Sequence, residues 1–354
     1  MIGAGVVGLS VAWLLVEQGH AVSLIDPALE TGQPQGAGSS AALGLLMGQI
    51  FRRSSGRGWR LRQQSLALWQ NWRSKLEQRG HVIPYRAGLL QLATNPEEFA
   101  AQQRLAEQRQ AQGLPLRLLD ADELSRLQPC LPAAAAGGLL SPADGQIDPL
   151  PAMQALLQDG RRQGLRSQTT TVFRLERRPG PLQQRWCVHT DAGSVQSCWV
   201  VVAAGLGSPS LLAPLGHQRP QSPVLGQALE LQLPAGCDAS PWPGSVSWDG
   251  INLVPRPDGR LWLGATVEPG LTTGAPEALT VLRELGGHAP DWLRQAAVLR
   301  HWQGLRARPD ASPAPLLEQL EPGLLLSSGH YRNGVLLAPA SAAWASEQIE
   351  QSQR

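Results

Sequence analysis

The clearest pattern of hydrophobic positions lies in residues 1–16, MIGAGVVGLSVAWLLV, which are almost wholly apolar. Three glycines within this stretch have the spacing GxGxxG, namely Gly3, Gly5 and Gly8. Apolar residues at helical spacing continue to Gly19, a residue type that commonly ends helices, and 22–25 (VSLI) then has the composition of a buried strand. The pattern predicts a glycine-rich turn, a helix and a strand that ends at Asp26.

Later segments alternate between helical and strand patterns. Helical periodicity is found at 59–80, within 97–128 and 144–164, at 276–299 and at about 339–348. Strand patterns are found around 171–176, 185–190, 198–203 and 323–328, and 221–270 alternates in strand fashion between turn signals. Because α/β segments stand at the start, middle and end, around a mostly antiparallel β region, the sequence predicts an α/β protein of two domains, the first discontinuous.

The glycine turn and Asp26 have the chemistry of a dinucleotide site. Glycines let the backbone turn tightly and approach a pyrophosphate, whose negative charge meets the positive end of the helix. Asp26 lies 26 − 3 = 23 residues after Gly3, close to the roughly 20 at which an acid binds a ribose hydroxyl. Its carboxylate would repel a 2′-phosphate, so FAD or NAD fits better than NADP. Glycines also serve tight helix packing, but the helix, strand and acid that follow favour a Rossmann-type domain.

Only Met1 and Ile2 precede the first glycine of this motif. The strand before such a turn is normally central in its sheet and buried on both faces. We therefore expect the natural protein to begin upstream, with a few apolar residues that complete the strand. A strand as short as this one would leave an unstable protein that holds little cofactor.

Composition and charge narrow the choice of partners. With 354 residues and a net charge of +2, the chain has the size of about two domains and no excess charge for binding a polyanion. An arginine cluster beside Trp59 is therefore interpreted as a solvated face rather than a nucleic-acid site; it comprises Arg52, Arg53, Arg57, Arg60 and Arg62. The cysteines lack the spacing of a zinc site or a disulfide framework; they are Cys130, Cys187, Cys198 and Cys237. We expect a cytoplasmic protein without a metal or a membrane span.

Eight segments resemble the FAD-dependent D-amino-acid oxidase superfamily, and within it the glycine oxidases of thiamine biosynthesis. They are IGAGVVGLS (2–10), GSSAALGLL (38–46), DGQIDP (144–149), VVVAAG (200–205), SPVLGQAL (222–229), LVPRPDGRLWLGAT (253–266), WQGLR (302–306) and SGHYRNGVLLAP (328–339). The last is the most specific, and together they cover essentially the whole chain in order. We expect a FAD-binding domain of residues 1–80, 140–215 and 303–354, and a substrate-binding domain of residues 81–139 and 216–302.

The resemblance also implies the cofactor contacts, position by position. Around the glycine turn and after the second strand, contacts to the pyrophosphate and ribose are expected from Gly3, Gly5, Val6, Val7, Gly8, Asp26 and Pro27. The loop along the pyrophosphate and flavin is matched by Gly38, Ser39, Leu43, Gly44 and Leu45, and a strand residue at the adenine by Val172. The segment beneath the flavin is matched by His330, Tyr331, Arg332, Asn333, Gly334, Val335 and Leu336. No cysteine falls in these segments, so we expect FAD to be held noncovalently.

The same resemblance implies the substrate contacts. Arg306 in WQGLR matches the arginine that binds the substrate carboxylate, a role that suits the planar fork of a guanidinium. Arg332 matches a second arginine of the site. Two positions depart from the glycine-oxidase pattern: Asn252 stands where a tyrosine helps to bind the carboxylate, and Val267 stands where methionine is usual. These departures leave the preferred amine open.

The implied activity is oxidative deamination of glycine or a related small amino acid, with hydride transfer from Cα to flavin N5 and reoxidation by O₂ to H₂O₂. Such a transfer depends on placement more than on a protein acid or base, so no catalytic residue is assigned. The resemblance further implies a role in forming the thiazole of thiamine. Two alternatives stay open: a D-amino-acid or sarcosine dehydrogenase that uses an electron carrier, and a non-catalytic homologue without cofactor. The expected partners are the amino acid and O₂, not nucleic acid or a membrane, and a homo-oligomer is left open.

Overall fold

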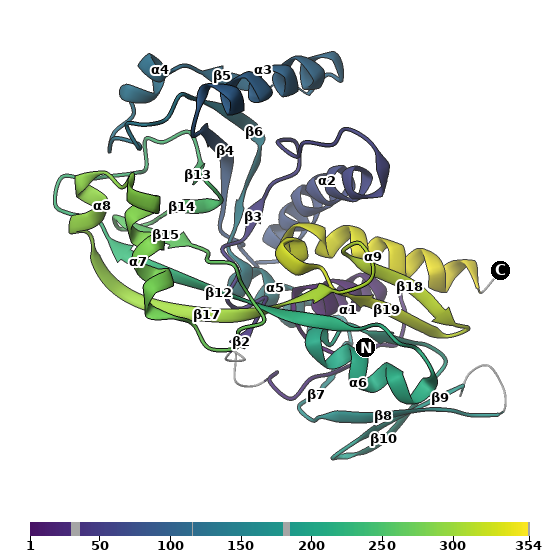
Figure 1. The fold of residues 1–354 in the computed structure, drawn as a ribbon. Helices are drawn as coiled ribbons and strands as arrows, with labels where there is room; N and C mark the ends of the chain where they lie inside the picture. The colour runs from purple at the N-terminus through teal and green to yellow at the C-terminus, as the bar shows by residue number, and fades with distance from the viewer. Residues whose placement is uncertain (30–35, 115, 180–184, 353–354) are drawn as a thin grey trace.

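Two sheets organise the protein (Figure 1). The structure, a computed structural model, describes residues 1–29, 36–114, 116–179 and 185–352. A small, mainly parallel sheet lies among the helices near the two termini, and a large, mostly antiparallel sheet extends away from them. This arrangement agrees with the α/β fold class predicted from the sequence.

The small sheet has the strand order β7-β1-Ile2-β11-β19-β18. Its strands are β1 (Ser23–Ile25), β7 (Arg166–Gln168), β11 (Val200–Val202), β18 (Leu316–Glu321) and β19 (Leu324–Ser328). Ile2 alone stands at the centre and forms parallel bridges to Ile25 on one side and Val202 on the other. Its N–H donates to Val201 O at 3.0 Å, and the N–H of Gly3 donates to Ile25 O at 2.9 Å. The glycine turn therefore emerges from the middle of the sheet.

Four long helices pack around this sheet: α1 (Val6–Glu17), α2 (Gly56–Gln78), α5 (Pro149–Arg162) and α9 (Gly334–Gln351). Helix α1 contacts both α5 and α9, and nine of its twelve residues are buried. Its apolar sequence is explained by this burial, since a helix that is apolar on all sides belongs in a core. Indole rings join α1 to α2, with the rings of Trp13 and Trp72 centred 4.7 Å apart.

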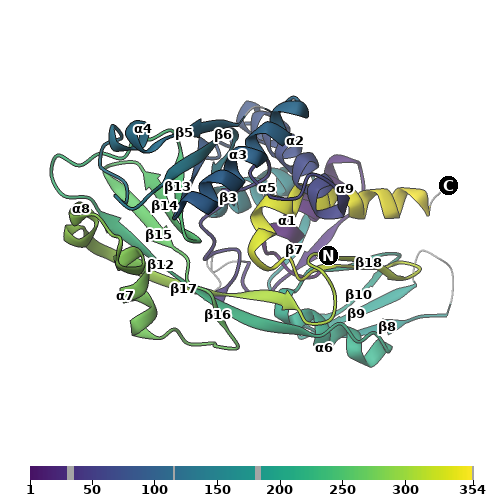
Figure 2. The same cartoon turned by 45° about the horizontal axis from the view of Figure 1, so that its top comes forward.

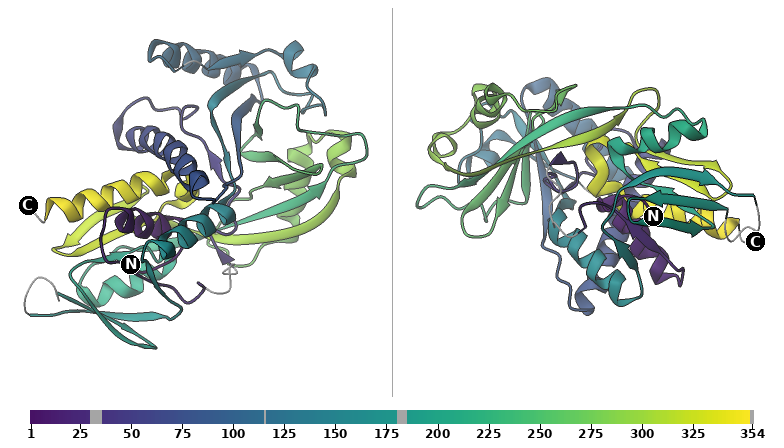
Figure 3. Two further views of the ribbon diagram at one scale, coloured as in Figure 1. Left: turned by 180° about the vertical axis from the view of Figure 1, so that it is seen from behind. Right: turned by 90° about the horizontal axis from the view of Figure 1, so that it is seen from below.

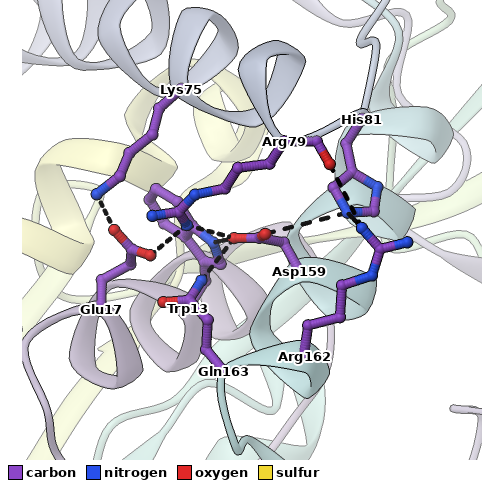
Figure 4. A network of polar contacts seen from close by, with 8 residues as sticks. All are labelled: Trp13, Glu17, Lys75, Arg79, His81, Asp159, Arg162 and Gln163. Atoms are coloured by element: carbon purple, nitrogen blue, oxygen red, sulfur yellow. Dashed lines mark hydrogen bonds and ion pairs between the residues drawn. The ribbon is translucent and has the colours of Figure 1, made fainter.

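A polar network around Asp159 of α5 ties three of these helices together (Figure 4). The buried carboxylate accepts hydrogen bonds from Trp13 Nε1 at 2.8 Å, from Arg79 at 2.8 Å and from Gln163 Nε2 at 2.6 Å. Arg79 also pairs with Glu17 at the end of α1. Burial on its own raises the pKa of Asp159, but the bonds from Trp13 and Arg79 outweigh it, so the pKa lies below its ordinary value.

The sequence predicted a last helix that begins at about Pro339, but helix α9 already begins at Gly334. Pro339 lies inside the helix and lacks the N–H that would bond to Val335 O. The indole N–H of Trp69 donates to that carbonyl instead, at 2.8 Å. A tertiary hydrogen bond thus replaces the missing helical one, a compensation that local periodicity does not reveal.

A three-stranded sheet and short helices complete the region of the small sheet. They are β8 (Val172–Arg177), β9 (Trp186–Thr190), β10 (Gly193–Ser197), η2 (Gly205–Gly207), α6 (Ser208–Leu212), η3 (Ala213–Leu215) and η5 (Tyr331–Asn333). The expected strands at 171–176, 185–190 and 198–203 correspond to β8, β9 and β11.

Within the described ranges, the large sheet has eleven strands. They are β2 (Gly36–Ala37), β3 (Leu45–Leu46), β4 (Tyr85–Ala93), β5 (Arg117–Leu119), β6 (Gly137–Ile147), β12 (Gln221–Gln232), β13 (Ser245–Trp248), β14 (Ile251–Arg256), β15 (Arg260–Gly264), β16 (Glu268–Pro269) and β17 (Ala297–Pro309). The main path is β2-β17-β12-β15-β14-β13-β4-β6-β3, with β16 beside β12 and β5 beside β6. The long antiparallel β12–β17 pair runs along this sheet toward the small one (Figure 2).

The remaining helices lie at the outer part of the large sheet, away from α1 and α9 (Figure 3). They are α3 (Pro96–Ala111), α4 (Ala121–Ser125), α7 (Pro276–Glu284), η4 (Leu285–Gly287) and α8 (Asp291–Gln295). The prediction of one helix over 276–299 was wrong. Leu285 and Gly286 have positive φ angles that break the helix, and from Ala297 the chain is strand β17. Among the helices of the described ranges, none is both long and apolar enough to cross a bilayer.

We expect Asp159→Ala to destabilise the protein by at least about 1.5–3 kcal/mol, the range for one hydrogen bond to a charged group. Because the folded pKa is depressed, this contribution is present above the ordinary value of 3.8 and is lost as the pH falls through the folded pKa. Urea unfolding at neutral pH and near pH 3 measures both effects. The exposed Glu77→Ala serves as control and should change stability by less than about 0.5 kcal/mol. Equal loss in the two variants would contradict the role of the network.

Candidate functional site

A cavity of about 1180 Å³ is lined by residues of both sheets. It exceeds the roughly 300–1,000 Å³ of common small-molecule pockets, so it has room for a dinucleotide together with a small substrate. The glycine turn and Asp26 lie at the small sheet, and Asn252 and Arg306 come from the large one. The fold thus brings the predicted nucleotide and substrate residues to one cavity.

The glycine turn gives the cavity a positive helix end. Gly3 has a φ of +96°, and a Cβ there would lie 2.5 Å from Ala203 O, so only glycine fits between the turn and β11. Gly5 caps α1 without a side-chain hydrogen bond to the helix, and the first turn of α1 contains no acid. The N–H of Val6 donates to Ser39 Oγ at 3.1 Å. Unneutralised N–H groups at this end suit a pyrophosphate.

Asp26 follows β1 and braces the glycine turn from the other side. Its Oδ2 accepts a hydrogen bond from the N–H of Ala4, and its Oδ1 accepts one from the N–H of Ala28, both at 2.7 Å. The residue also lines the cavity. Each carboxylate oxygen can accept more than one hydrogen bond, so Asp26 can hold the turn and bind a ribose hydroxyl at the same time.

Most of the predicted cofactor residues line this cavity: Gly3, Gly5, Val7, Asp26, Pro27, Gly38, Ser39, Leu43, Gly44, Leu45, Val172, His330, Tyr331, Arg332, Asn333, Gly334 and Val335. Val6, Gly8 and Leu336 point elsewhere. The side chains of Val6 and Leu336 are buried in the helical core, and Gly8 packs against the backbone of Gly3. Their positions on α1 and α9 turn them toward the protein interior.

His330 stands at the entry to α9 and is fully buried. Ser341 Oγ donates to Leu337 O at 2.8 Å, so His330 Nε2 donates its proton to Ser341 Oγ, also at 2.8 Å. Burial, together with the charge of Arg57, lowers the pKa of His330 to about 3. This histidine is therefore neutral at physiological pH, and its Nε2 proton is engaged in the hydrogen bond to Ser341. It acts as a structural group rather than as an acid or base.

Arg306 on β17 is a cation held directly above Gly226 of β12. A Cβ on Gly226 would lie 2.1 Å from one guanidinium nitrogen. Arg306 Nη1 donates to Thr266 O at 2.9 Å and to Leu225 O at 3.2 Å. Within the described ranges no carboxylate forms an ion pair with it. A guanidinium without a counter-ion at a cavity wall is suited to bind an anion.

Burial, and after it the nearby charge of Arg332, lower the pKa of Arg306 to about 10 against the opposing effects of Tyr331 and Glu268. Arg306 nevertheless remains protonated at neutral pH. Arg332 is exposed at the cavity wall, in the η5 turn where Tyr331 has a φ of 53°. The two arginines are therefore neighbours that repel each other until an anion lies near them.

Asn252 lies on β14, where it pairs across the sheet with Ser247 of β13 and Gly264 of β15. It is buried and lines the cavity together with Ser247 and Gln91 of β4. This wall thus carries neutral hydrogen-bonding groups, whereas the wall at Arg306 carries positive charge.

Sequence reasoning missed part of the cavity wall. Ala203 to Gly207 follow the end of β11, and Ser327 to Gly329 comprise the last two residues of β19 and the residue after it. The rule that ligands bind at the carboxyl ends of parallel strands could have identified them.

The arginine cluster is only partly the solvated face that the sequence predicted. Arg52, Arg53 and Arg62 line the cavity, whereas Arg57 and Arg60 line a separate, smaller hollow beside α2. The cluster begins a few residues after the loop expected along the flavin. This short separation in the sequence could have predicted that part of the cluster lies at the cavity.

Comparisons with known proteins agree with this arrangement. A family model described as FAD-dependent oxidoreductase (DAO) matches residues 1–348. A glycine oxidase of Geobacillus kaustophilus is 27% identical, over 100% of this chain and 93% of the relative. The bifunctional protein ThiO/ThiG of Synechocystis is 32% identical over 99% of this chain, which spans about half (51%) of that relative. The crystal structure of glycine oxidase from Geobacillus kaustophilus superposes with a TM-score of 0.88 at 28% identity, covering 99% of this chain and 93% of that one.

Asp26→Ala removes the acceptor for Ala4 and Ala28 and the expected bond to the ribose. We expect the dissociation constant for FAD to rise about 10- to 100-fold, as the loss of one hydrogen bond to a charged group predicts. Fluorescence titration of the apoprotein with FAD measures it. Glu107→Ala, an exposed acid on α3, should leave FAD binding unchanged. Unaltered affinity in Asp26→Ala would place the ribose elsewhere.

Gly226→Ala tests whether the packing of the Arg306 guanidinium against Gly226 is needed for anion binding. The added Cβ would displace the guanidinium, so acetate binding, followed by the shift of the flavin absorbance spectrum, should weaken about tenfold or more while FAD content stays the same. Gly58→Ala adds a methyl group in open space near the start of α2 and is the matched control. Wild-type acetate affinity in Gly226→Ala would show that the anion does not bind at Arg306.

Proposed function

The chain belongs to the DAO family of FAD-dependent oxidoreductases, and from this premise we propose that it oxidises glycine or a related small amino acid at Cα with O₂ as electron acceptor. The glycine oxidases among its relatives support this substrate class. The overall reaction converts the amino acid, O₂ and water into the 2-oxo acid, ammonia and H₂O₂. The relation to the ThiO/ThiG proteins supports a role in thiamine thiazole formation, which we propose takes place in the cytoplasm.

The observation that carries this proposal is the guanidinium of Arg306 at the cavity wall, which forms no ion pair with any carboxylate of the described residues. A carboxylate is the natural partner of such a fork, because two parallel hydrogen bonds can form in one plane. We propose that Arg306 binds the substrate carboxylate and that Arg332 contributes a second positive charge to it. Asn252, on the neutral wall, donates its amide N–H to the bound substrate.

The residues of the cavity wall position the substrate rather than transfer protons. Bound FAD supplies the acceptor for the hydride that leaves Cα and passes the electrons to O₂. His330 is neutral and engaged with Ser341, and Asp26 is engaged at the turn of α1. We therefore assign no general acid or base, and the rate depends on how Arg306 orients Cα.

Asn252 leaves more room than a tyrosine at the same position. An amide side chain is shorter than a phenol, so the space above the substrate admits an N-methyl group or a larger side chain. Val267 follows Thr266, whose carbonyl supports Arg306, and is 43% exposed. We propose that this space widens the range of amines beyond glycine.

The resemblance to the family leads us to propose two further features. Residues 1–80, 140–215 and 303–354 form the FAD-binding domain, and residues 81–139 and 216–302 form the substrate-binding domain. FAD is held noncovalently, since each of the four cysteines lies outside the lining of the cavity in the described residues.

Amine oxidation should produce H₂O₂, and it should depend on Arg306. We expect Arg306→Ala to raise the apparent KM about 30- to 4000-fold, the effect of removing one partner of a buried charge pair, while FAD stays bound. A panel of glycine, N-methylglycine and D-amino acids with a peroxide assay measures it. Arg308→Ala changes an exposed arginine two residues away on β17 and should behave as wild type.

Substrate turnover without H₂O₂ would identify a dehydrogenase rather than an oxidase. An unchanged KM in Arg306→Ala would move the carboxylate site to another cation, with Arg332 the next to test.

A further inference from the structure

We propose that the cavity contains a second anion subsite, formed by Arg62 with Arg52 and Arg53, so that the preferred amines carry a second acidic group. The inference deepens the proposed function and takes it as its premise. The substrate class is a dicarboxylic amino acid, with one carboxylate at Arg306 and the other at Arg62.

Arg62 of α2 is a buried cation that forms no ion pair within the described ranges, although the charge of Asp144 acts on it from the protein interior. Its side chain stacks on the ring of Phe51 at 4.0 Å and donates from Nη1 to Asn333 Oδ1 at 3.1 Å. The residue is 9% exposed, and its Nε has no hydrogen-bond partner among the described residues. Burying a charge without a partner is costly. Arg62 lines the cavity, so a bound anion would pair with its charge from the cavity side, while Nε stays buried in the protein.

Arg62 is connected to the surroundings of Arg306 through the η5 turn. Arg332 is close enough to Arg306 to lower its pKa, and the next residue, Asn333, accepts the hydrogen bond from Arg62. The η5 turn thus joins the two cationic positions, and a ligand held at Arg306 meets the charge of Arg62 beyond Arg332.

Two buried charged side chains, Asp144 and Arg109, hold the backbone of the segment that contains Arg52 and Arg53. The buried carboxylate of Asp144 accepts hydrogen bonds from the backbone N–H groups of residues 48–50, at 2.8, 2.8 and 3.0 Å. Arg109, also buried, donates to the carbonyls of Gln49 at 2.8 Å and Arg53 at 3.2 Å, and to that of Phe51. The N–H groups of residues 48–50 and the carbonyls of Gln49, Phe51 and Arg53 are therefore hydrogen-bonded to buried side chains. The side chains of Arg52 and Arg53 are left at the cavity wall.

The positive charges of the described cavity lining outnumber its negative charges. Five arginines line it, namely Arg52, Arg53, Arg62, Arg306 and Arg332, against one carboxylate, that of Asp26. Asp26 is engaged at the start of α1, where the pyrophosphate is expected. The single carboxylate of glycine would balance only part of the positive charge. A second acidic group on the substrate balances it better and gains charge-assisted hydrogen bonds.

Succinate and succinamate test the subsite without any turnover, because neither carries an amine and they differ in one carboxylate against one amide. We expect the FAD-loaded protein to bind succinate about 10- to 100-fold more tightly than succinamate, as titration of the flavin absorbance shift would show. Arg62→Gln should remove this preference and leave succinamate affinity unchanged. Arg60→Gln, an exposed arginine on the same helix, should keep the preference in full.

A second variant tests the same subsite if Arg62→Gln does not fold. The double change of Arg52→Gln and Arg53→Gln alters exposed side chains and should reduce the succinate preference severalfold. Equal affinity for the two ligands in the unaltered protein would overturn the proposal, as would a preference that survives both changes.

The amine assay separates this result from the proposed function. Faster H₂O₂ formation with aspartate than with asparagine, lost in Arg62→Gln, supports both. A succinate preference without peroxide from any amine would retain the subsite and reject the oxidase.

Discussion

The site depends on holding the guanidinium of Arg306 against strand β12 without an ion pair to any carboxylate of the described residues. Burial opposes this charge, as the lowered pKa near 10 shows, so its support has to come from dipoles fixed in place. The carbonyls of Leu225 and Thr266 provide that support. Gln227 fixes the second of them, because its backbone N–H donates to Thr266 Oγ1 and its carbonyl accepts from the N–H of Thr266. The cation is thus oriented before any ligand arrives.

The side chain of Gln227 extends this support away from the cavity. Its Nε2 donates to Glu268 at 2.9 Å and to Ala275 O at 3.1 Å, and its Oε1 contacts His301 Nε2 at 3.0 Å. Glu268 lies close enough to raise the pKa of Arg306 without forming an ion pair with it. A direct ion pair would occupy the fork and exclude the substrate. The carboxylate of Glu268 stabilises the charge of Arg306 without a direct contact, so the hydrogen-bonding edge of the guanidinium stays open.

The nucleotide end of the cavity could be predicted from the sequence because its parts are local. Gly3, Gly5 and Asp26 lie within one strand–turn–helix–strand unit, and their spacing alone determines where they meet. The carboxylate of Asp26 bonds to Ala4, only 22 residues away. The resemblance placed Arg306, Arg332 and Asn252 at the cavity. The overall charge balance assigned Arg62 to a solvated face, and no local pattern could show its partner Asn333, which is 271 residues distant.

The same difference in range separates cofactor recognition from substrate choice. The turn at Gly3 is braced by β11, Ser39 and Asp26, whereas Arg306, Asn252 and Arg62 stand on β17, β14 and α2. A change at Asn252 or Arg62 alters the amine side of the cavity without touching the contacts that form the glycine turn. Relatives can therefore share the motif at 1–26 and the whole fold while differing in the amines they prefer. The motif identifies the cofactor, and under the proposed function the charges contributed by distant elements select the substrate.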